Sequence, residues 1–375
     1  MNRERVLVAL SGGVDSAVAA ALLVEAGHDV TAVHLRLADV APDVQVPGQG
    51  CCTLDDAQDA RRTAQVLGVP FVVWDLTEVF RAAVQEPFAA AYAAGTTPNP
   101  CVACNEHVKV RGVLRRARQL GFDALATGHH ARVGTAANGT PVLRRAVDRE
   151  KDQSYVLHVH GPDELAHLRF PVGAHTKDEV RDLAAARGLR VAAKPDSYDV
   201  CFVPDGDTAG YLADRLPVVP GDVVDVEDGA VLGRHGGVWR FTVGQRRGLG
   251  LDHHRRRFVV DLDAATNTVW VGPREALAAT WLDLDAPTWG SGRPPAPAAD
   301  GGPPRVLVQV RAHGRPHAGR WDDDRRRVRL DEPVHGVAVG QSAVLYDLDD
   351  ETCLGGGRIR AVDRAAARGP VTARR

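Results

Sequence analysis

The chain has 375 residues, enough for two or three domains, with 44% hydrophobic and 25% charged residues and a formal net charge of −2. The absence of an apolar run of about 18 residues excludes a membrane-spanning helix, and the near-neutral charge gives no overall sign of nucleic-acid binding. The first predicted strand leaves no room for a signal peptide before it, so we expect a cytoplasmic protein.

The first predicted strand, 6–10, is followed by Ser-Gly-Gly-Val-Asp-Ser at 11–16, where a helix over 15–26 begins. The two glycines allow the backbone to approach a ligand closely, and the first amides of a helix attract anions. The two serines add hydroxyl donors, and Asp15 could hold Mg²⁺. No G-x-x-x-x-G-K-[ST] lysine follows. The turn is therefore predicted to bind a pyrophosphate rather than a transferred γ-phosphoryl group.

Strands and helices alternate through the first two hundred residues. Further strands are predicted over 29–35, 69–76 and 122–127, and helices over 55–67, 78–94 and 106–120. This order predicts an α/β fold with an open, doubly wound parallel sheet. Ligands of such sheets lie beyond the carboxyl ends of the strands, so the loops 95–104 and 128–130 are expected near the first turn.

The pattern then changes towards β structure. Asn138-Gly139 predicts a hairpin with a type I′ turn. Thr176 to Glu179 forms a capping box that opens a helix ending at 187. After residue 205 the strands become short, and 270–284 and 305–348 are predicted to be all-β.

The segment 286–304, rich in proline and glycine, is predicted to be an exposed, partly disordered insertion.

Two cysteines lie in polar loops. Cys104 ends a loop where the helix over 106–120 is predicted to begin, with Asn105 as its N-cap, and a helix N-terminus lowers a thiol pKa. Cys201 lies in the polar loop 194–202. Two reactive cysteines beside a nucleotide cradle indicate sulfur transfer, in which one thiol delivers sulfur and the other releases it.

The remaining cysteines give weaker signals. Cys101 and Cys104 form a C-x-x-C pair, but no second pair completes the four ligands of a zinc site. Cys51 and Cys52 are interpreted as small buried residues or a loop edge, and Cys353 lies in a glycine-rich turn without a signal. The pair at 253–254, two histidines, is interpreted as a solvated turn.

Several motifs in order resemble the bacterial tRNA-specific 2-thiouridylases, a family of the PP-loop ATP-pyrophosphatase superfamily. The resemblance runs from residue 5 to about 360 and rests on the segments 9–16, 51–62, 97–105, 127–129, 151–155, 194–202 and 242–249. It implies an adenine nucleotide alpha hydrolase-like PP-loop domain over 1–204, a small central domain over 205–268, a C-terminal β-barrel over 269–363 and a tail over 364–375.

The resemblance also implies a reaction. ATP, with Mg²⁺, adenylates the C2 oxygen of the wobble uridine of tRNA and releases pyrophosphate. Cys201 carries sulfur as a persulfide, and Cys104 frees it, which ends in a Cys104–Cys201 disulfide. The tRNAs for Lys, Glu and Gln are the implied substrates, and a cysteine desulfurase or a sulfur-carrier protein is the implied donor.

The family's contacts are transferred position by position. ATP contacts map to Ala9, Leu10, Ser11, Gly12, Gly13, Val14, Asp15, Ser16, Leu35 and Gly128. Contacts to the target base map to Asn99, Pro100 and Cys101, and other tRNA contacts map to His129, Lys151, Asp152, Gln153, Arg311, Ala312 and Gln341.

Four positions depart from the family pattern. Cys101 stands where some members have Asp, Leu35 where Met is common, His130 in place of Tyr, and Ala312 in place of an aromatic residue. Two other functions stay open at this point. One is a different PP-loop ligase or synthetase, which needs neither Cys104 nor Cys201. The other is a non-catalytic RNA-binding module with zinc, which needs a completed metal site and no phosphate cradle.

Overall fold

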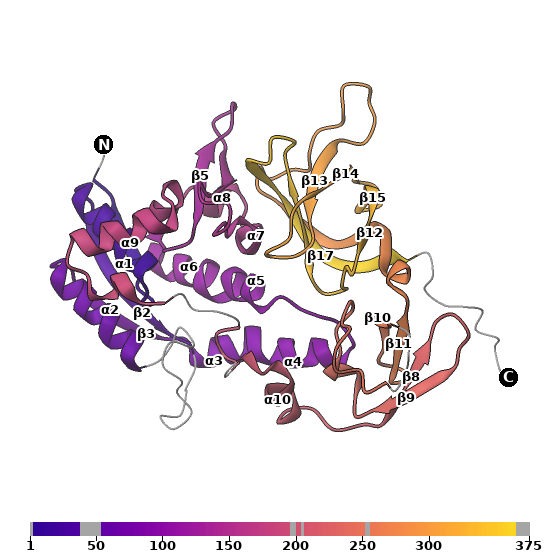
Figure 1. Cartoon of the computed structure of the whole chain (residues 1–375). Helices are drawn as coiled ribbons and strands as arrows, with labels where there is room; N and C mark the ends of the chain where they lie inside the picture. Colours follow the sequence, from indigo (N-terminus) through magenta and orange to yellow (C-terminus); the bar gives the residue numbers. More distant parts are fainter. Residues whose placement is uncertain (1–2, 38–53, 196–199, 204–205, 252–255, 365–375) are drawn as a thin grey trace.

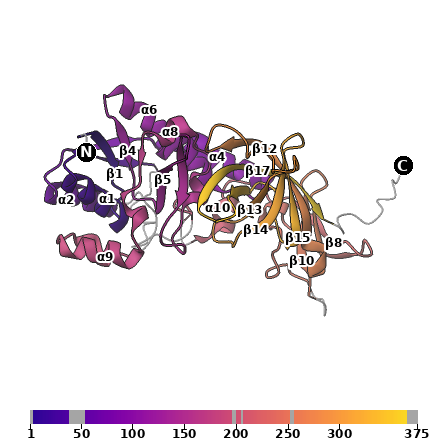
Figure 2. The same cartoon turned by 90° about the horizontal axis from the view of Figure 1, so that it is seen from above.

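The computed structural model describes residues 3–37, 54–195, 200–203, 206–251 and 256–364. Cys51, Cys52 and the histidine pair at 253–254 lie outside this part. An α/β domain forms one end of the molecule and two β domains form the other (Figures 1 and 2). In the described part, no helix is long and apolar enough to cross a membrane.

The α/β domain is built on a five-stranded parallel sheet in the order β3-β2-β1-β4-β7. Its strands are β1 (Arg5–Ala9), β2 (Asp29–Arg36), β3 (Phe71–Asp75), β4 (Ala124–Ala126) and β7 (Leu168–Arg169). Alternate residues of β1 face opposite sides, so Val6 and Val8 join one core and Leu7 another.

Helices cover both faces of this sheet, as the doubly wound pattern predicts. α1 (Val14–Glu25) and α2 (Leu54–Val66) contribute alanines to the core that holds Val6 and Val8. α6 (Arg111–Gln119) contributes to the core of Leu7. α9 (Lys177–Ala186) packs on the outer side of α1 through Val180 and Ala184. The capping box of Thr176 and Glu179 is confirmed, with both reciprocal hydrogen bonds present.

Two longer helical segments each contain a π-helical turn. The predicted helix 78–94 consists of α3 (Thr77–Phe80), η2 (Arg81–Gln85) and α4 (Glu86–Ala93). The helix predicted over 106–120 begins earlier, as α5 (Pro100–Cys104), and continues through η3 (Asn105–Lys109) into α6. α5 lies beside η2 and below the barrel (Figure 1).

The predicted hairpin is present but its turn type is wrong. β5 (Ala131–Thr135) and β6 (Pro141–Arg145) are antiparallel. Gly139 has a φ of +85°, whereas Asn138 does not have a positive φ, which a type I′ turn requires at both positions. The hairpin leaves the α/β domain and pairs through β6 with β17 of the barrel.

Five short helices lie between the β5–β6 hairpin and the central domain, in the part of the chain that the structure describes. They are α7 (Ser154–Leu157), α8 (Pro162–Leu165), η4 (Pro171–Ala174), η5 (Arg190–Ala193) and α10 (Thr208–Ala213). The central domain then forms a four-stranded sheet in the order β10-β11-β8-β9. Its elements are β8 (Gly221–Asp225), β9 (Val231–His235), η7 (Val238–Arg240), β10 (Phe258–Asp263), β11 (Thr268–Gly272) and η8 (Arg274–Leu277). The boundary expected after 268 would cut β11 from this sheet.

The C-terminal domain is a closed barrel, because β12 pairs with both β15 and β17. Its strands are β12 (Ala278–Trp289), β13 (Arg305–Gln309), β14 (His317–Asp322), β15 (Arg327–His335), β16 (Ser342–Tyr346) and β17 (Thr352–Arg364). The prediction of an exposed insertion over 286–304 is wrong at its start, because residues 286–289 belong to β12 and Trp289 packs on Trp321. Cys353 is likewise in strand β17, not in a turn.

Candidate active site

The turn between β1 and α1 forms a tight cradle. Gly12 has a φ of +82°, and a Cβ there would lie 2.4 Å from the backbone oxygen of Asp56 in α2. Ser16 Oγ accepts a hydrogen bond from the amide of Ser11 at 3.2 Å and donates to the Gly13 carbonyl at 3.0 Å. The arrangement leaves the first amides of α1 in position for an anion, so the residues of this turn fit the phosphates of a nucleotide.

Two residues predicted to contact ATP border this cradle from neighbouring strands. Gly128 follows β4, and a Cβ there would lie 2.5 Å from the amide nitrogen of Ser16, so only glycine fits against α1. Leu35 lies in β2 with 8% of its surface exposed and packs into the core, which leaves its backbone as the group able to meet a ligand.

The carboxylate of Asp15 contacts two side chains from distant segments, a lysine and a histidine. Lys177 Nζ lies 2.7 and 2.8 Å from its two carboxylate oxygens, and His130 Nε2 lies 3.2 Å from one of them. Burial opposes ionisation of Asp15, but the hydrogen bonds and charges of His130 and Lys177 outweigh it and lower its pKa. Asp15 is therefore ionised at neutral pH, which suits a carboxylate that coordinates Mg²⁺.

A second lysine connects the cradle to the segment before Cys201. Lys194 Nζ donates to the Gly12 carbonyl at 3.0 Å and to carboxylates of Asp56 and Asp59 at 2.8 Å each. Burial disfavours the charge of Lys194, but its two acidic partners raise its pKa overall.

Cys104 is not at a helix N-terminus, which corrects the sequence prediction. Asn99, not Asn105, is the N-cap, and its Oδ1 accepts hydrogen bonds from the amides of Cys101 and Val102 at 3.0 and 3.3 Å. Asn105 is buried one residue beyond α5, and its Oδ1 has no hydrogen-bond partner in the described part. The first-turn position that activates a thiol belongs to Cys101, which is exposed, while Cys104 is only 5% exposed.

Cys104 and Cys201 pack against the same hydrophobic cluster. Cys104 is part of it, and Cys201 lies at its margin. Phe202 anchors the second cysteine, since its ring stacks edge to face on Phe88 with centroids 5.3 Å apart. Cys353 is not a candidate nucleophile, because burial raises the pKa of its thiol to about 12.

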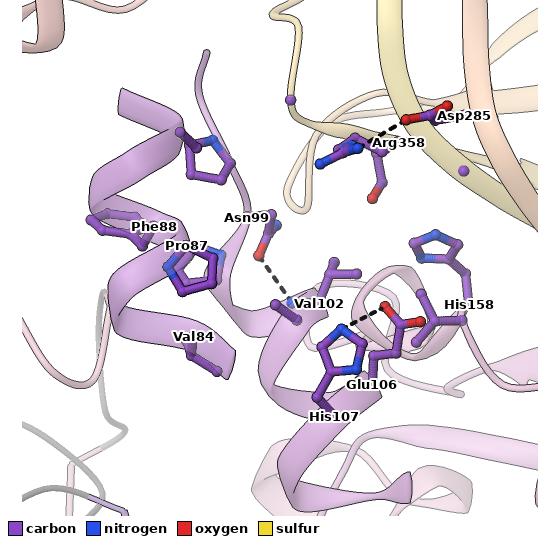
Figure 3. Close-up of a pocket in the computed structure, with 18 of the residues that line it drawn as sticks. Val84, Pro87, Phe88, Asn99, Val102, Glu106, His107, His158, Asp285 and Arg358 are labelled. Carbon is purple, nitrogen blue, oxygen red and sulfur yellow. Dashed lines mark hydrogen bonds and ion pairs between the residues drawn. The ribbon is translucent and has the colours of Figure 1, made fainter. Parts of the chain in front are cut away.

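A cavity of about 400 Å³ lies between the α3–η2–α4 segment, α5 and the barrel strands β12 and β17 (Figure 3). Polar side chains of its walls are paired, with Arg358 2.8 Å from Asp285 and His107 3.6 Å from Glu106. Asn99 and Pro100 line the cavity, whereas Cys101 and Cys104 are not part of the lining. The predicted base contacts thus divide between the cavity and the exposed end of α5.

Several predicted tRNA contacts form hydrogen bonds within the protein. Asp152 accepts hydrogen bonds from Arg145 at 2.7 Å and Ser154 at 2.6 Å. Gln153 Oε1 accepts from the amide of His130 at 2.9 Å. Gln341 donates to the backbone of the loop before α5. These three side chains have protein partners that any contact with tRNA has to share or replace.

The other predicted tRNA contacts are more peripheral to this network. Arg311 donates to the backbone oxygens of His335 and Gly336, and the Ala312 carbonyl accepts from Gln309. Lys151 lines a second cavity of about 400 Å³ that Lys177 also lines. His129 Nδ1 is 2.7 Å from Thr127 Oγ1, and burial, with help from the charge of Lys109, lowers the pKa of His129 to about 3. His129 is therefore a neutral imidazole at physiological pH.

Four residues of the site were not predicted from the sequence, namely Lys177, Lys194 and the acidic pair Asp56 and Asp59. A signal was present, because lysine is rare in this arginine-rich chain and the two aspartates are three residues apart on one face of α2.

Comparison with known proteins covers most of the chain. Residues 4–205 match the family model described as tRNA methyl transferase HUP domain, 209–273 the tRNA methyl transferase PRC-barrel domain, and 280–359 the aminomethyltransferase beta-barrel domain. Among solved structures, a 4-thiouridine synthetase in complex with RNA and ATP is similar at 18% identity and a TM-score of 0.33, over 54% of this chain and 46% of that one.

Curated relatives are closer and extend over nearly the full length. A protein of Salinispora arenicola named tRNA-specific 2-thiouridylase MnmA is 53% identical over 96% of this chain and 100% of its own length. Proteins of the same name from Thermobifida fusca and a Nocardioides species are 53% and 50% identical, over 92% and 97% of this chain and 93% and 100% of their own lengths. The chain belongs to the tRNA-specific 2-thiouridylase family.

Proposed function

We propose that the protein transfers sulfur to C2 of the wobble uridine of tRNA in an ATP-dependent reaction. The observation that supports the proposal is a series of contacts between the phosphate cradle and the two cysteines. Lys194, seven residues before Cys201, donates a hydrogen bond to Gly12 of the cradle, and Cys201 packs against the cluster that contains Cys104. A nucleotide site and two thiols are thus connected within one domain. A methyl transfer, which the names of two family models suggest, needs no such pair of thiols.

The first step uses ATP as an activating reagent. The C2 oxygen of the uridine attacks the α-phosphate, and pyrophosphate leaves. The cradle at 11–16 binds the phosphates through backbone amides and serine hydroxyls. The resulting adenylate makes the C2 oxygen a better leaving group, because it now departs with AMP.

The second step moves the sulfur. Cys201 carries it as a persulfide, and the terminal sulfur attacks C2 while AMP leaves with the former C2 oxygen. The thiolate of Cys104 attacks Sγ of Cys201 and breaks the S–S bond of the persulfide. A Cys104–Cys201 disulfide forms, and an external reductant supplies the two electrons that restore both thiols.

This proposal requires movement near Cys104. The thiol is 5% exposed and does not line the cavity beside α5. The disulfide step also needs the Cα atoms of the two cysteines within about 7 Å of each other. Binding of tRNA at Asn99, Pro100 and Cys101 would open the cluster around Phe202 and expose the buried Cys104 thiol. A base that is splayed out of a single-stranded loop is the usual substrate of such a site.

The remaining components follow from the family and the site. Asp15 fits Mg²⁺, which would neutralise phosphate charge when bound. The tRNAs for Lys, Glu and Gln are the proposed substrates, and a cysteine desulfurase or a sulfur-carrier protein is the proposed donor. We place the reaction in the cytoplasm.

The test combines product analysis of both substrates. The purified protein is incubated with ATP, Mg²⁺, unmodified tRNA, a cysteine desulfurase and cysteine. Mass spectrometry of the digested tRNA is expected to show 2-thiouridine, and the nucleotide products are expected to be AMP and pyrophosphate. Formation of ADP and phosphate, or formation of AMP without thiolated uridine, would refute the assignment, and the second outcome would favour another PP-loop ligase.

A further inference from the structure

Lysine is confined to four positions in a chain with 46 lysine and arginine residues, namely 109, 151, 177 and 194. All the remaining residues in this count are arginines. An ammonium group is compact and donates in three directions, whereas a guanidinium is a planar fork, so the two are not interchangeable in a narrow site. Lys177 and Lys194 both contact the cradle, which indicates that the cradle requires ammonium groups in particular.

Lys177 is placed on the cradle from outside the sheet. It is the first residue of α9, its amide donates to Asp148 at 2.9 Å, and its side chain is only 10% exposed. Its Nζ contacts both oxygens of Asp15, 162 residues earlier in the chain. Asp15 is the second residue of α1, so the Lys177 ammonium contacts a side chain of the first helical turn. The backbone amides of this same turn are the groups that we expect to bind the phosphates.

Lys177 also lines a cavity of about 400 Å³, together with the cationic residues Lys151 and Arg181 and the acidic residues Asp148, Glu150 and Asp178. The Asp15 carboxylate that Lys177 contacts is the group that would hold Mg²⁺. A divalent ion there would repel the ammonium, which would then pair with the phosphates of a nucleotide bound at the cradle.

We propose that Lys177 is a phosphate-binding residue of the ATP site. It neutralises Asp15 while no nucleotide is bound, and it would bind the β- and γ-phosphate oxygens of ATP once Asp15 held Mg²⁺. A lysine from α9 thus supplies the charge that the G-x-x-x-x-G-K-[ST] lysine supplies in P-loop proteins. The inference rests on the proposed function only in taking ATP as the substrate, and it does not depend on the sulfur chemistry.

The test measures binding by calorimetry with the full-length protein, without tRNA. MgATP, magnesium pyrophosphate and AMP are titrated into wild type, Lys177→Met and Lys177→Arg. Loss of a charge-assisted hydrogen bond should weaken MgATP and pyrophosphate binding by about 10- to 100-fold in Lys177→Met. AMP lacks the β- and γ-phosphates, so its affinity should stay within about twofold. Lys177→Arg should lose affinity for MgATP as well, because the planar guanidinium does not fit the space that the compact ammonium occupies.

Arg187→Met serves as the matched control. Arg187 is the C-cap of the same helix and pairs with Glu25 at the surface, so the variant removes one positive charge from α9 without touching the cradle. Its affinities should equal those of wild type. If Lys177 only neutralises Asp15, Lys177→Met would bind MgATP as tightly as wild type or more tightly, and this result would overturn the proposal.

A second pair of variants addresses folding. Lys177→Met leaves the partly buried Asp15 carboxylate with His130 alone, which destabilises the domain. Asp15→Asn and the double variant Asp15→Asn, Lys177→Met both lack that charge. Pyrophosphate should bind about tenfold more weakly to the double variant than to Asp15→Asn. Equal affinities would overturn the proposal, and failure of wild type to bind MgATP would overturn the proposed function together with it.

Discussion

Gln341 of the barrel donates hydrogen bonds through Nε2 to the backbone oxygens of Thr97 and Pro98, at 2.9 and 3.3 Å. The Thr97 amide in turn donates to the Val339 carbonyl at 2.9 Å. A Cβ at Gly340 would lie 3.0 Å from the Thr97 backbone, so the two segments are in direct contact. The C-terminal domain therefore fixes the loop from which the cysteine-bearing helix α5 begins.

This contact predicts an effect of Gln341→Leu on the rate of thiolation. Loss of two hydrogen bonds to partly buried carbonyls should lower the free energy of unfolding by about 1–2 kcal/mol and loosen the loop before Asn99. We expect the rate at saturating tRNA to fall about tenfold, as for other misplaced catalytic groups, while the Kd for ATP is unchanged. Single-turnover thiolation measures the rate. A higher Kd for tRNA with a normal rate would instead make Gln341 a tRNA contact, as the family resemblance implies.

A buried ion pair predicts a different phenotype for Asp152. Its side chain is 3% exposed and that of Arg145, its partner, is 6% exposed. The Arg145 guanidinium also stacks on the Tyr346 ring and donates to Gln309, so the pair connects the hairpin to the barrel. Asp350 also lies 2.8 Å from Arg145, so Asp152→Ala leaves the buried guanidinium with one carboxylate partner, and the free energy of unfolding in urea should fall by about 1.5–3 kcal/mol.

Lys151→Ala is the neighbouring control for Asp152→Ala. Lys151 lies beside a surface cavity, so its loss should leave the unfolding free energy within about 0.5 kcal/mol of wild type. Its affinity for tRNA should fall if it contacts a phosphate. An Asp152→Ala protein of normal stability with weakened tRNA binding would contradict the structural role.

His158 predicts a loss of stability in mild acid. It is 2% exposed, and burial lowers its pKa from 6.5 to about 4 even though its Nδ1 hydrogen bonds to the Tyr155 carbonyl. Between pH 6.5 and 4 the unfolded chain binds a proton that the folded chain does not. Stability is thus full above pH 6.5 and falls toward pH 4, by up to about 1.4 kcal/mol per pH unit. Urea unfolding of wild type and His158→Phe should show a shallower pH slope in the variant, and parallel slopes would contradict the assignment.

The sequence predicted the α/β domain well because its signals are local. The glycine turn at 11–16, the capping box of Thr176 and the alternation of strands and helices depend on nearby residues, and each is present in the structure. The errors arose where distant segments decide. The hairpin 131–145 looked like part of the first domain, yet its β6 pairs with β17 and extends the sheet of the barrel.

The candidate site shows the same division. The Gly12 cradle follows from its own glycine turn, whereas the partners of Asp15 come from residues 130 and 177, which no spacing rule connects to it. The helix of Cys104 was predicted too short because Pro100 and Asn99 look like loop residues. Proline is well placed in the first turn of a helix and Asn is a good N-cap, so the pair starts α5.

The loop between β12 and β13 offers a test of which part of 286–304 is dispensable. Residues 291–301 are mostly exposed and make local turn hydrogen bonds, such as Gly301 to Ala298. Their deletion should change the unfolding free energy by less than about 1 kcal/mol and leave thiolation intact. Trp289→Ala is the contrast, because the Trp289 ring packs on Trp321 and its removal should cost about 2 kcal/mol. A large fall in Tm on deletion would show that the loop packs.

The two cysteines should differ in what they carry. With a desulfurase and labelled cysteine, peptide mapping should find the persulfide on Cys201, because the thiol of Cys104 has to stay reduced to release the sulfur. Cys104→Ser and Cys201→Ser should each abolish thiolation and leave the Kd for ATP unchanged, since neither residue is among the predicted ATP contacts. Cys353→Ala is the control, because a thiol with a pKa of about 12 is not a nucleophile at neutral pH and its loss should affect stability alone. Turnover without reductant should leave a Cys104–Cys201 disulfide. A label on Cys104, or normal thiolation by Cys201→Ser, would reverse or remove the roles proposed for these residues.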